Sequence, residues 1–182
     1  MDIRLLRIDS ALKQKKGLHF ILASIILWTA ITILHLLDLP ILTKNLYTFY
    51  LTAPLVPLAF LISKVIKVDF QIKDNPLCNL GVLFSINQML YLLIAMWVFP
   101  TVPDKMLMVI AIIFGAHLLP YGWLYISKTY MFFSLFIPLF ALFVGINFSP
   151  YVLGIGMIII EVIFSLSLMI EVKSLKKLVS ET

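Results

Sequence analysis

The chain has 182 residues, of which 62% are hydrophobic and 13% are charged, and its mean hydropathy is +1.08. Soluble domains are roughly 45–50% apolar and about 25% charged, so this composition excludes a soluble globular domain and predicts an integral membrane protein. The single cysteine, Cys78, excludes an intramolecular disulfide framework and a cysteine-based metal cluster.

Residues 1–17 alternate basic and apolar positions. Leu5, Ile8 and Leu12 can share one helix face with arginines and lysines around it, which is typical of a short amphipathic helix on anionic headgroups. A basic tail that only enforces topology is the alternative. The apolar run that follows is too long for the core of a signal peptide and lacks a small-residue cleavage site, so we expect a retained first transmembrane helix.

Residues 18–170 divide into apolar stretches separated by polar or proline-containing breaks. A helix needs about 20 apolar residues to cross a bilayer, and the stretches near this length are Leu18–Leu37, Leu46–Ile66, Leu77–Phe99, Met106–Ser127, Tyr130–Phe148 and Tyr151–Ile170. The sequence therefore predicts an all-α fold, a polytopic bundle of about six transmembrane helices in one domain. Residues 171–182 follow it as a basic cytoplasmic tail.

The distribution of basic residues predicts the orientation. With the N-terminus inside, twelve of the fourteen Lys and Arg residues fall on the cytoplasmic side, and only Lys44 and Lys105 fall outside. Because Lys and Arg accumulate in cytoplasmic loops, we expect both termini in the cytoplasm. This segregation also accounts for the net charge of +5 without a nucleic-acid partner.

Polar side chains in the middle of the spans are the candidate site residues. Glu161 lies ten residues into the sixth span and His117 at a similar depth in the fourth, while Asn87 and Gln88 lie in the third, with Tyr91 one turn further on. A charge at the bilayer centre costs at least about 2.5–3.5 kcal/mol, so Glu161 should be neutral or paired inside the bundle. These residues predict a buried polar pocket at the midplane. The alternative is that they only hydrogen-bond the helices together.

Prolines predict irregular helix backbone near this depth. Tyr121 lies one turn beyond His117 on the same face of the fourth span, and Pro120 should kink the helix there because it cannot donate a backbone hydrogen bond. Prolines also interrupt the second and fifth spans, at Pro54, Pro57 and Pro138. Their corresponding positions are compatible with two inverted halves, a common transporter plan.

Familiar catalytic motifs are absent from the sequence. It contains no Gly-x-Ser-x-Gly, His-Glu-x-x-His or phosphate-binding glycine loop. Its three histidines, His19, His35 and His117, are spread over both faces and the centre of the membrane and cannot converge on one metal ion. We therefore expect neither a metal nor a cofactor.

Two stretches carry a resemblance to a known family. They are Phe114-Gly115-Ala116-His117-Leu118-Leu119-Pro120-Tyr121-Gly122-Trp123, followed by Tyr125, Ser127 and Tyr130, and Ser63-Lys64 through Asp69-Phe70 to Asn75-Pro76, with Gln14-Lys15-Lys16-Gly17 upstream. Together they resemble a family of small bacterial integral membrane proteins known only as a domain of unknown function. The resemblance covers nearly the whole chain and implies a six-helix unit in a bacterial plasma membrane. It implies no activity.

Three functions are compatible with these observations. The leading hypothesis is a membrane transporter or solute-binding membrane subunit with a midplane pocket, in which Glu161 or His117 couples binding to a proton. The second is an intramembrane enzyme acting on a lipid or a small apolar substrate, with His117 as base. The third is a structural or regulatory membrane protein. The expected partners are membrane lipids and a small-molecule ligand, and a homo-oligomer is compatible with the sequence.

Topology reporters test the predicted orientation. Fusions placed near Lys44, Lys105 and Pro150 should report an outside location, and those near Lys73, Lys128 and the C-terminus an inside location, because positive loops stay in the cytoplasm. Alkaline phosphatase and fluorescent-protein activities measure the two sides. An outside location of the C-terminus would require an odd number of spans and contradict the predicted topology.

Overall fold

The computed structural model describes residues 2–72 and 74–181, and most of them are helical. In chain order the elements are α1 (Ile3–Lys13), the short 3₁₀ turn η1 (Lys15–Gly17), α2 (Leu18–Leu36), α3 (Ile41–Thr52), α4 (Leu55–Val65), α5 (Leu77–Thr101), the turn η2 (Pro103–Lys105), α6 (Met106–Ala116), α7 (Leu119–Leu124), α8 (Lys128–Asn147) and α9 (Pro150–Ser180). Lys73, which the sequence places in a cytoplasmic loop, lies outside the described residues.

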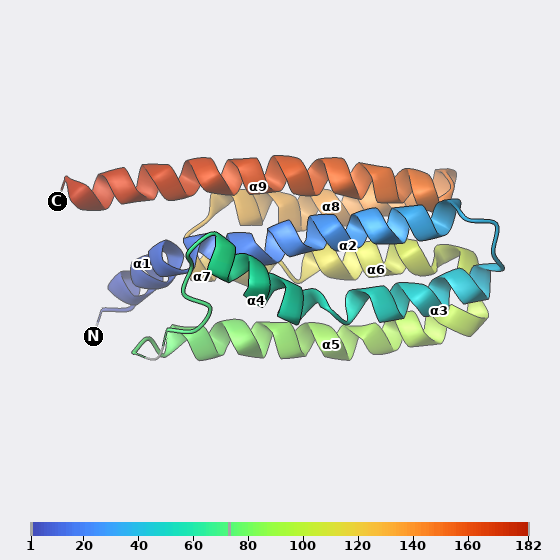
Figure 1. Cartoon of the computed structure of the whole chain (residues 1–182), viewed down its shortest axis with the longest axis horizontal. Helices are drawn as coiled ribbons and strands as arrows, with labels where there is room; N and C mark the ends of the chain where they lie inside the picture. The colour runs from blue at the N-terminus through green and yellow to red at the C-terminus, as the bar shows by residue number, and fades with distance from the viewer. Residues whose placement is uncertain (1, 73, 182) are drawn as a thin grey trace.

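The helices form an elongated bundle with both termini at the same end (Figure 1). We call this the basal end. Among the described residues, five helical segments are long and apolar enough to cross a membrane, and α3 with α4, bent by 43° at a short break, makes up a sixth. The chain is therefore an all-α bundle with five or six helices able to span a membrane, as its composition predicts.

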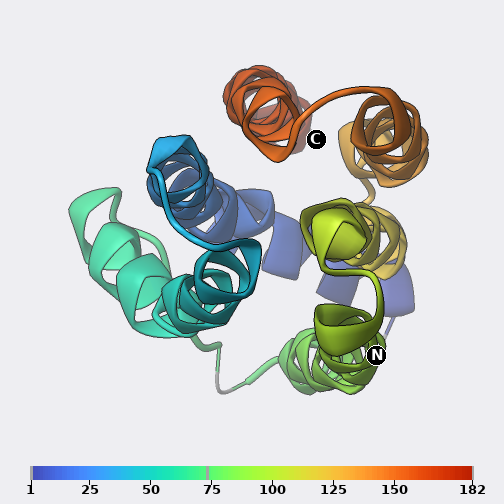
Figure 2. The same ribbon diagram turned by 90° about the vertical axis from the view of Figure 1, so that its right-hand side faces the viewer.

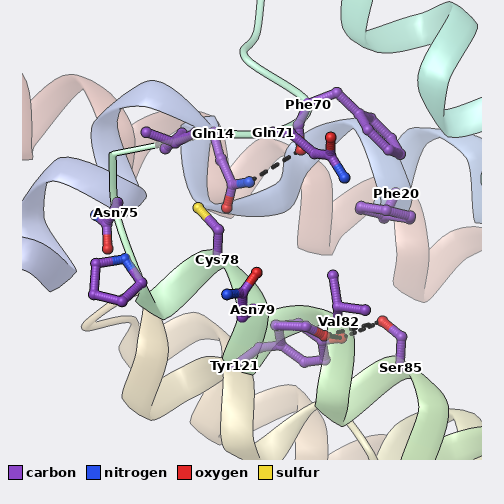
Figure 3. A pocket seen from close by; sticks show the side chains of 13 residues that line it. Gln14, Phe20, Phe70, Gln71, Asn75, Cys78, Asn79, Val82, Ser85 and Tyr121 are labelled. Atoms are coloured by element: carbon purple, nitrogen blue, oxygen red, sulfur yellow. Dashed lines mark hydrogen bonds between the residues drawn. The ribbon is translucent and has the colours of Figure 1, made fainter.

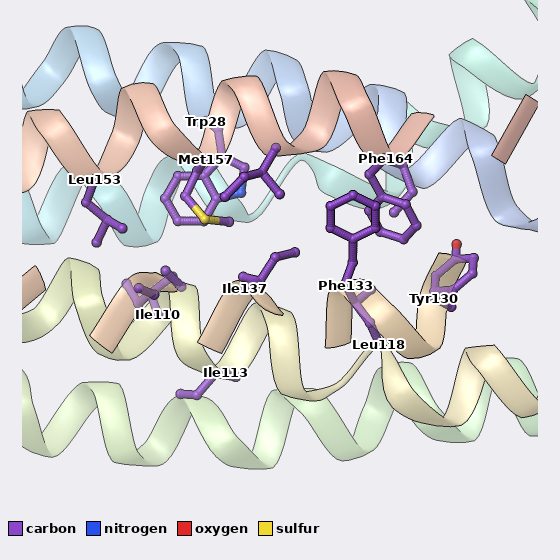
Figure 4. Packing of buried hydrophobic residues seen from close by; sticks show 14 of the residues in the cluster. Trp28, Ile110, Ile113, Leu118, Tyr130, Phe133, Ile137, Leu153, Met157 and Phe164 are labelled. Atoms are coloured by element: carbon purple, nitrogen blue, oxygen red, sulfur yellow. The ribbon is translucent and has the colours of Figure 1, made fainter. Parts of the chain in front are cut away.

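The packed core lies between α2, α6, α8 and α9. The most extensive helix pairs are α9 against α2 and α6 against α8. Phe133 of α8 stacks on Phe164 of α9 with ring centroids 4.7 Å apart, and Tyr130 meets Phe164 edge-on at 4.9 Å (Figure 4). Helices in lipid associate through close packing of this kind, and each such aromatic pair adds about 0.5–1.5 kcal/mol beyond its buried area.

Two elements lie at the periphery of the core. α4 packs on α2, whereas α5 packs chiefly on α6, and the two peripheral helices occupy separate positions around the bundle (Figure 2). Much of α5 is exposed, including Leu83, Leu93 and Trp97. Because the helix is apolar on all sides, this surface suits contact with lipid.

The two predicted terminal segments are both helical: the basic N-terminal segment contains α1, and most of the C-terminal tail belongs to α9. α1 packs on the bundle through Leu6, Ser10 and Ala11, while Leu5 lies outside this contact. α9 continues without interruption to Ser180, so most of the predicted tail extends the last helix beyond the apolar stretch.

The four prolines expected to disturb the spans have different surroundings. Pro54 lies in the break between α3 and α4, and Pro120 lies in the first turn of α7, after α6 has ended at Ala116. Pro57 lies inside α4, and Pro138 lies inside α8, which runs as one helix. The clearest bend in a span is therefore the one at Pro54.

Gly154 allows α9 to approach α2 closely, and its replacement tests this packing. A Cβ at this position would collide with Thr32 Oγ1 and lie 3.1 Å from Thr32 Cβ, so Gly154→Ala should separate the helices and lower the free energy of unfolding by about 1–3 kcal/mol. Thermal unfolding in detergent measures the effect. Gly81→Ala is the matched control, since a Cβ there would lie 3.5 Å from Leu124 Cδ2. Equal losses in both variants would contradict the role of Gly154.

Candidate functional site

A cavity of about 330 Å³ lies halfway along the bundle, between α2, the α3–α4 break, α5 and α6. We call it the midspan cavity. Its wall includes the rings of Trp28, Phe49 and Phe114, and its hydroxyl and amide groups come from Ser24, Thr52 and Gln88. Because these residues lie near the middle of their spans, the cavity lies at hydrocarbon depth when the helices cross a membrane.

The α3–α4 break forms one wall of the midspan cavity. Ala53, which follows α3, keeps helical backbone angles, and the backbone leaves the helical path at Pro54, the N-cap of α4. Proline has no N–H to donate, so an interruption here leaves carbonyl groups without their helical partners. Irregular backbone at membrane depth is tolerated where it lines a cavity or is buried in protein, and Thr52, Ala53 and Leu55 all line this one.

The mouth of the cavity lies on the side of the bundle. Val56, just after the break, is 55% exposed, and Met89 on α5 is 63% exposed, yet both also line the cavity. α4 is held by α2 and α5 by α6, so the opening lies between two helices with different neighbours. A molecule dissolved in the bilayer can therefore reach the cavity without passing through water.

Glu161 on α9 lies behind the cavity and is fully buried. Ser24 on α2 connects the two, because its Oγ lies 2.6 Å from Glu161 Oε2 and its side chain also lines the cavity. The other carboxyl oxygen, Oε1, has no hydrogen-bond partner among the described residues. An unpaired buried acceptor costs about 1–3 kcal/mol, so this oxygen is the strongest candidate for a functional contact at this depth.

His117 and Tyr121 belong to a different part of the molecule. The Nδ1 atom of His117 lies 2.5 Å from the carbonyl oxygen of Phe114 in the preceding turn, and its ring packs edge-on against Tyr121. The Tyr121 hydroxyl donates to the carbonyl of Gly81 at 3.0 Å and lies 2.7 Å from Ser85 Oγ. The structure therefore does not join this imidazole to the buried carboxyl in one midplane pocket, as the sequence predicts, and Tyr121 connects α7 to α5 instead.

Of the three candidate residues on α5, one reaches the midspan cavity. Gln88 lines it, whereas Asn87 donates to the Tyr91 hydroxyl at 2.9 Å on the exposed face of the helix. Successive residues of an α-helix point about 100° apart, so neighbours in sequence do not share a face. Ser24 is not among the residues predicted from the sequence, and its signal is a hydroxyl in the first apolar stretch at a depth close to that of the other polar groups.

A second cavity, of about 280 Å³, lies at the basal end beside the start of α5 (Figure 3). Gln14 lies on its wall, donates to the carbonyl of Phe70 at 3.3 Å and accepts a hydrogen bond from the Tyr125 hydroxyl at 2.9 Å. Cys78 and Asn79 of α5 also line it. Gln14 therefore joins its own segment to two others distant in sequence, and all three belong to the stretches that carry the family resemblance.

Asn75 fastens the loop before α5 to α1. Its Nδ2 donates to the carbonyl of Leu6 at 2.9 Å and to Asp9 Oδ2 at 3.0 Å. Burial acts to raise the pKa of Asp9, but the hydrogen bonds from Lys13 and Asn75 outweigh it and hold that pKa below the ordinary carboxyl value. This contribution to stability is complete above the ordinary carboxyl pKa and is lost as the pH falls through the lowered one.

A buried ion pair joins three elements near the basal end. Lys16 is 3% exposed, and its Nζ lies 2.8 Å from Glu171 Oε2. The same carboxylate accepts hydrogen bonds from Ser127 Oγ at 2.6 Å and from the backbone N–H and hydroxyl of Thr129 at 2.9 and 2.8 Å. Glu171 thus ties η1 and the start of α8 to α9, a structural role that the sequence analysis did not assign.

Removal of this carboxylate tests its role. Glu171→Gln should lower the free energy of unfolding by about 1–3 kcal/mol, because the Lys16 ammonium stays buried without a counter-charge. Thermal unfolding measures the loss, and the double variant Lys16→Met/Glu171→Gln should recover part of it. Glu181→Gln is the control, since its 3.9 Å contact with Lys177 is exposed and such pairs contribute little. A double variant whose loss equals the sum of the single losses would contradict the pairing.

Comparison with known proteins identifies a family for the chain but no activity. The sequence matches the profile of a family of unknown function, DUF7010, over residues 3–171. No curated protein matches the chain, and no solved structure matches it. The match spans nearly the whole sequence and confirms the resemblance to a domain of unknown function. The chain belongs to the DUF7010 family of unknown function.

Proposed function

We propose that this protein is a solute-binding membrane protein that takes a lipophilic small molecule from the bilayer into the midspan cavity. The observation that carries the proposal is an apolar cavity at mid-span whose mouth lies between the α3–α4 break and α5. Release of the molecule on the other side of the membrane would make the protein a transporter. The predicted topology and the family resemblance favour a bacterial plasma membrane.

The dimensions and lining of the cavity support a small-molecule ligand. Ligand sites in proteins usually have about 300–1,000 Å³ and a mainly apolar lining with a few placed polar groups. The midspan cavity has about 330 Å³, three aromatic rings and hydroxyl or amide groups from Ser24, Thr52 and Gln88. This arrangement suits an apolar body with one polar group.

The break in the span formed by α3 and α4 supports reversible binding, in which a ligand enters and leaves the cavity. Substrate sites of many transporters lie near the midplane beside discontinuous helices, and the α3–α4 break lies in this position. Because α5 packs chiefly on α6, a small outward movement of α5 widens the mouth and leaves the α2–α9 packing intact. The hypothesis of an intramembrane enzyme has less support, since His117 and Glu161 have separate hydrogen-bond partners.

Photolabelling with a small apolar diazirine tests the proposed binding. In nanodiscs, labelling of Trp28 and Phe114 should saturate with probe concentration, because both line a cavity of limited volume. Labelling of Leu135, which is 66% exposed on α8, should rise without saturation because it contacts lipid. Mass spectrometry of peptides measures both. Excess unlabelled apolar analogue should remove only the saturable labelling.

A substitution at the mouth of the midspan cavity, paired with a control substitution outside it, tests the same proposal. Ala53→Phe places a ring in the cavity and should reduce saturable labelling at least about fivefold. Ala116→Phe adds the same ring at an exposed position outside the cavity and should leave the labelling unchanged. Non-saturable labelling at every position, or saturable labelling that Ala53→Phe leaves intact, would overturn the proposal.

A further inference from the structure

We infer that the ligand of the midspan cavity carries an ammonium group and binds in exchange for a proton on Glu161. This inference rests on the proposed function and names the class of its ligand, a lipophilic amine. Three features carry it: the hydrogen bonding of Ser24, the unpartnered oxygen of Glu161 and the aromatic lining of the cavity.

The surroundings of Ser24 show which form of Glu161 fits the structure. Ser24 Oγ lies 2.7 Å from the carbonyl oxygen of Ile21 and 2.6 Å from Glu161 Oε2. A hydroxyl has one proton to donate, and the Ile21 carbonyl can only accept. Both contacts can be hydrogen bonds at the same time when Ser24 donates to the Ile21 carbonyl and a protonated Glu161 donates to Ser24. The observed arrangement is therefore the one with a neutral carboxyl.

Loss of that proton would leave a charge without a counter-ion. The titratable groups on the elements packed against α9 that lie within the described spans are Lys128 and Tyr130 on α8, His19 and His35 on α2, and Lys15 and Lys16 in η1. Lys128 is exposed at the start of α8, and the Lys15 ammonium donates to the carbonyl of Ile66. The Tyr130 hydroxyl donates to the carbonyl of Lys16, and the Lys16 ammonium is paired with Glu171.

The described residues show no hydrogen bond between either histidine of α2 and the carboxylate, and both ring nitrogens of the buried His19 have no partner there. His19 lies five residues before Ser24 on α2, and its ring packs against Phe20 and Phe70. His35 lies eleven residues after Ser24, about 16 Å along the helix, and bonds to Thr48. A cationic ligand supplies the missing charge.

The cavity places such a cation correctly. An ammonium group that donates to Ser24 Oγ would lie within about 5.5 Å of the Glu161 carboxylate, one hydrogen-bond length beyond the Ser24–Glu161 contact. Trp28, Phe49 and Phe114 surround the same space, and aromatic faces attract cations. The apolar remainder of the cavity accepts the hydrocarbon part of the amine.

The exchange is balanced in charge and in protons. An alkylammonium ion enters from the membrane interface, the Glu161 carboxyl gives up one proton to water, and an ammonium–carboxylate pair remains. Since a proton competes with each ammonium, the apparent affinity should fall up to tenfold for each pH unit below the value at which Glu161 loses its proton. A neutral ligand of the same length releases no proton and should show no such dependence.

Competition between decylamine and decanol for the diazirine-labelled cavity tests this inference. Decylamine should displace the probe from Trp28 and Phe114 with an affinity that rises with pH, and decanol with an affinity that does not. In Glu161→Gln, which keeps the shape of the side chain, decanol should still displace the probe. Decylamine should there lose its pH dependence and at least about tenfold in affinity. Because the partitioning of each compound into the bilayer is the same for both proteins, the comparison isolates Glu161.

Two further outcomes decide the inference. Ser24→Ala removes the hydroxyl that joins cavity and carboxyl, so it should also weaken decylamine more than decanol, and it serves if Glu161→Gln does not fold. Equal pH dependence of decylamine in the wild type and Glu161→Gln, or an equal loss of decylamine and decanol affinity in Ser24→Ala, would overturn the amine inference while decanol displacement upholds the proposed function. Failure of both compounds and of the apolar analogue to displace the probe would defeat the proposed function itself.

Discussion

The pairing of backbone groups in hydrocarbon constrains every part of this molecule. Lipid offers no hydrogen bonds, so each N–H and C=O must be satisfied inside its own helix or beside a cavity. The long helices pair most of their backbone groups internally, although Pro138 inside α8 removes one donor. The break at Pro54 interrupts this pairing, and the structure places it against the midspan cavity. The position of this cavity is thus a consequence of where the second span cannot remain helical.

The cost of placing polar groups in hydrocarbon also applies to the buried carboxyl of Glu161. At 0% exposure, Glu161 is unfavourable as an isolated ion, and the short contact with Ser24 accounts for one of its oxygens only. A protein under selection for stability alone has simpler ways to fill this position, since an apolar side chain of similar size would pack there without a desolvation cost. The unpartnered oxygen therefore points to a role outside the resting structure.

The depth of a residue in the membrane could be predicted from the sequence, but the direction in which its side chain points around the helix could not. Counting residues placed Glu161 near mid-span, and the cost of a charge there directed it inward. The choice of Ser24 as its partner depends on how α2 is rotated against α9, which Gly154 and Thr32 set by contact. Helices that are apolar on all sides carry little periodic signal, so nothing local distinguished Gln88, which lines the cavity, from Asn87, which does not. The Lys16–Glu171 pair was equally hidden, because its members lie 155 residues apart.

The pairing of α2 with α9 has a consequence for biogenesis. α2 precedes the other spans of this bundle in the sequence, and its most extensive partner, α9, follows them. Until α9 is inserted, the Ser24 side of α2 faces lipid or a temporary neighbour, and the bundle cannot close around its core. Insertion of α9 is therefore the step that closes this bundle, because only α9 brings the Glu161 carboxyl to the Ser24 hydroxyl.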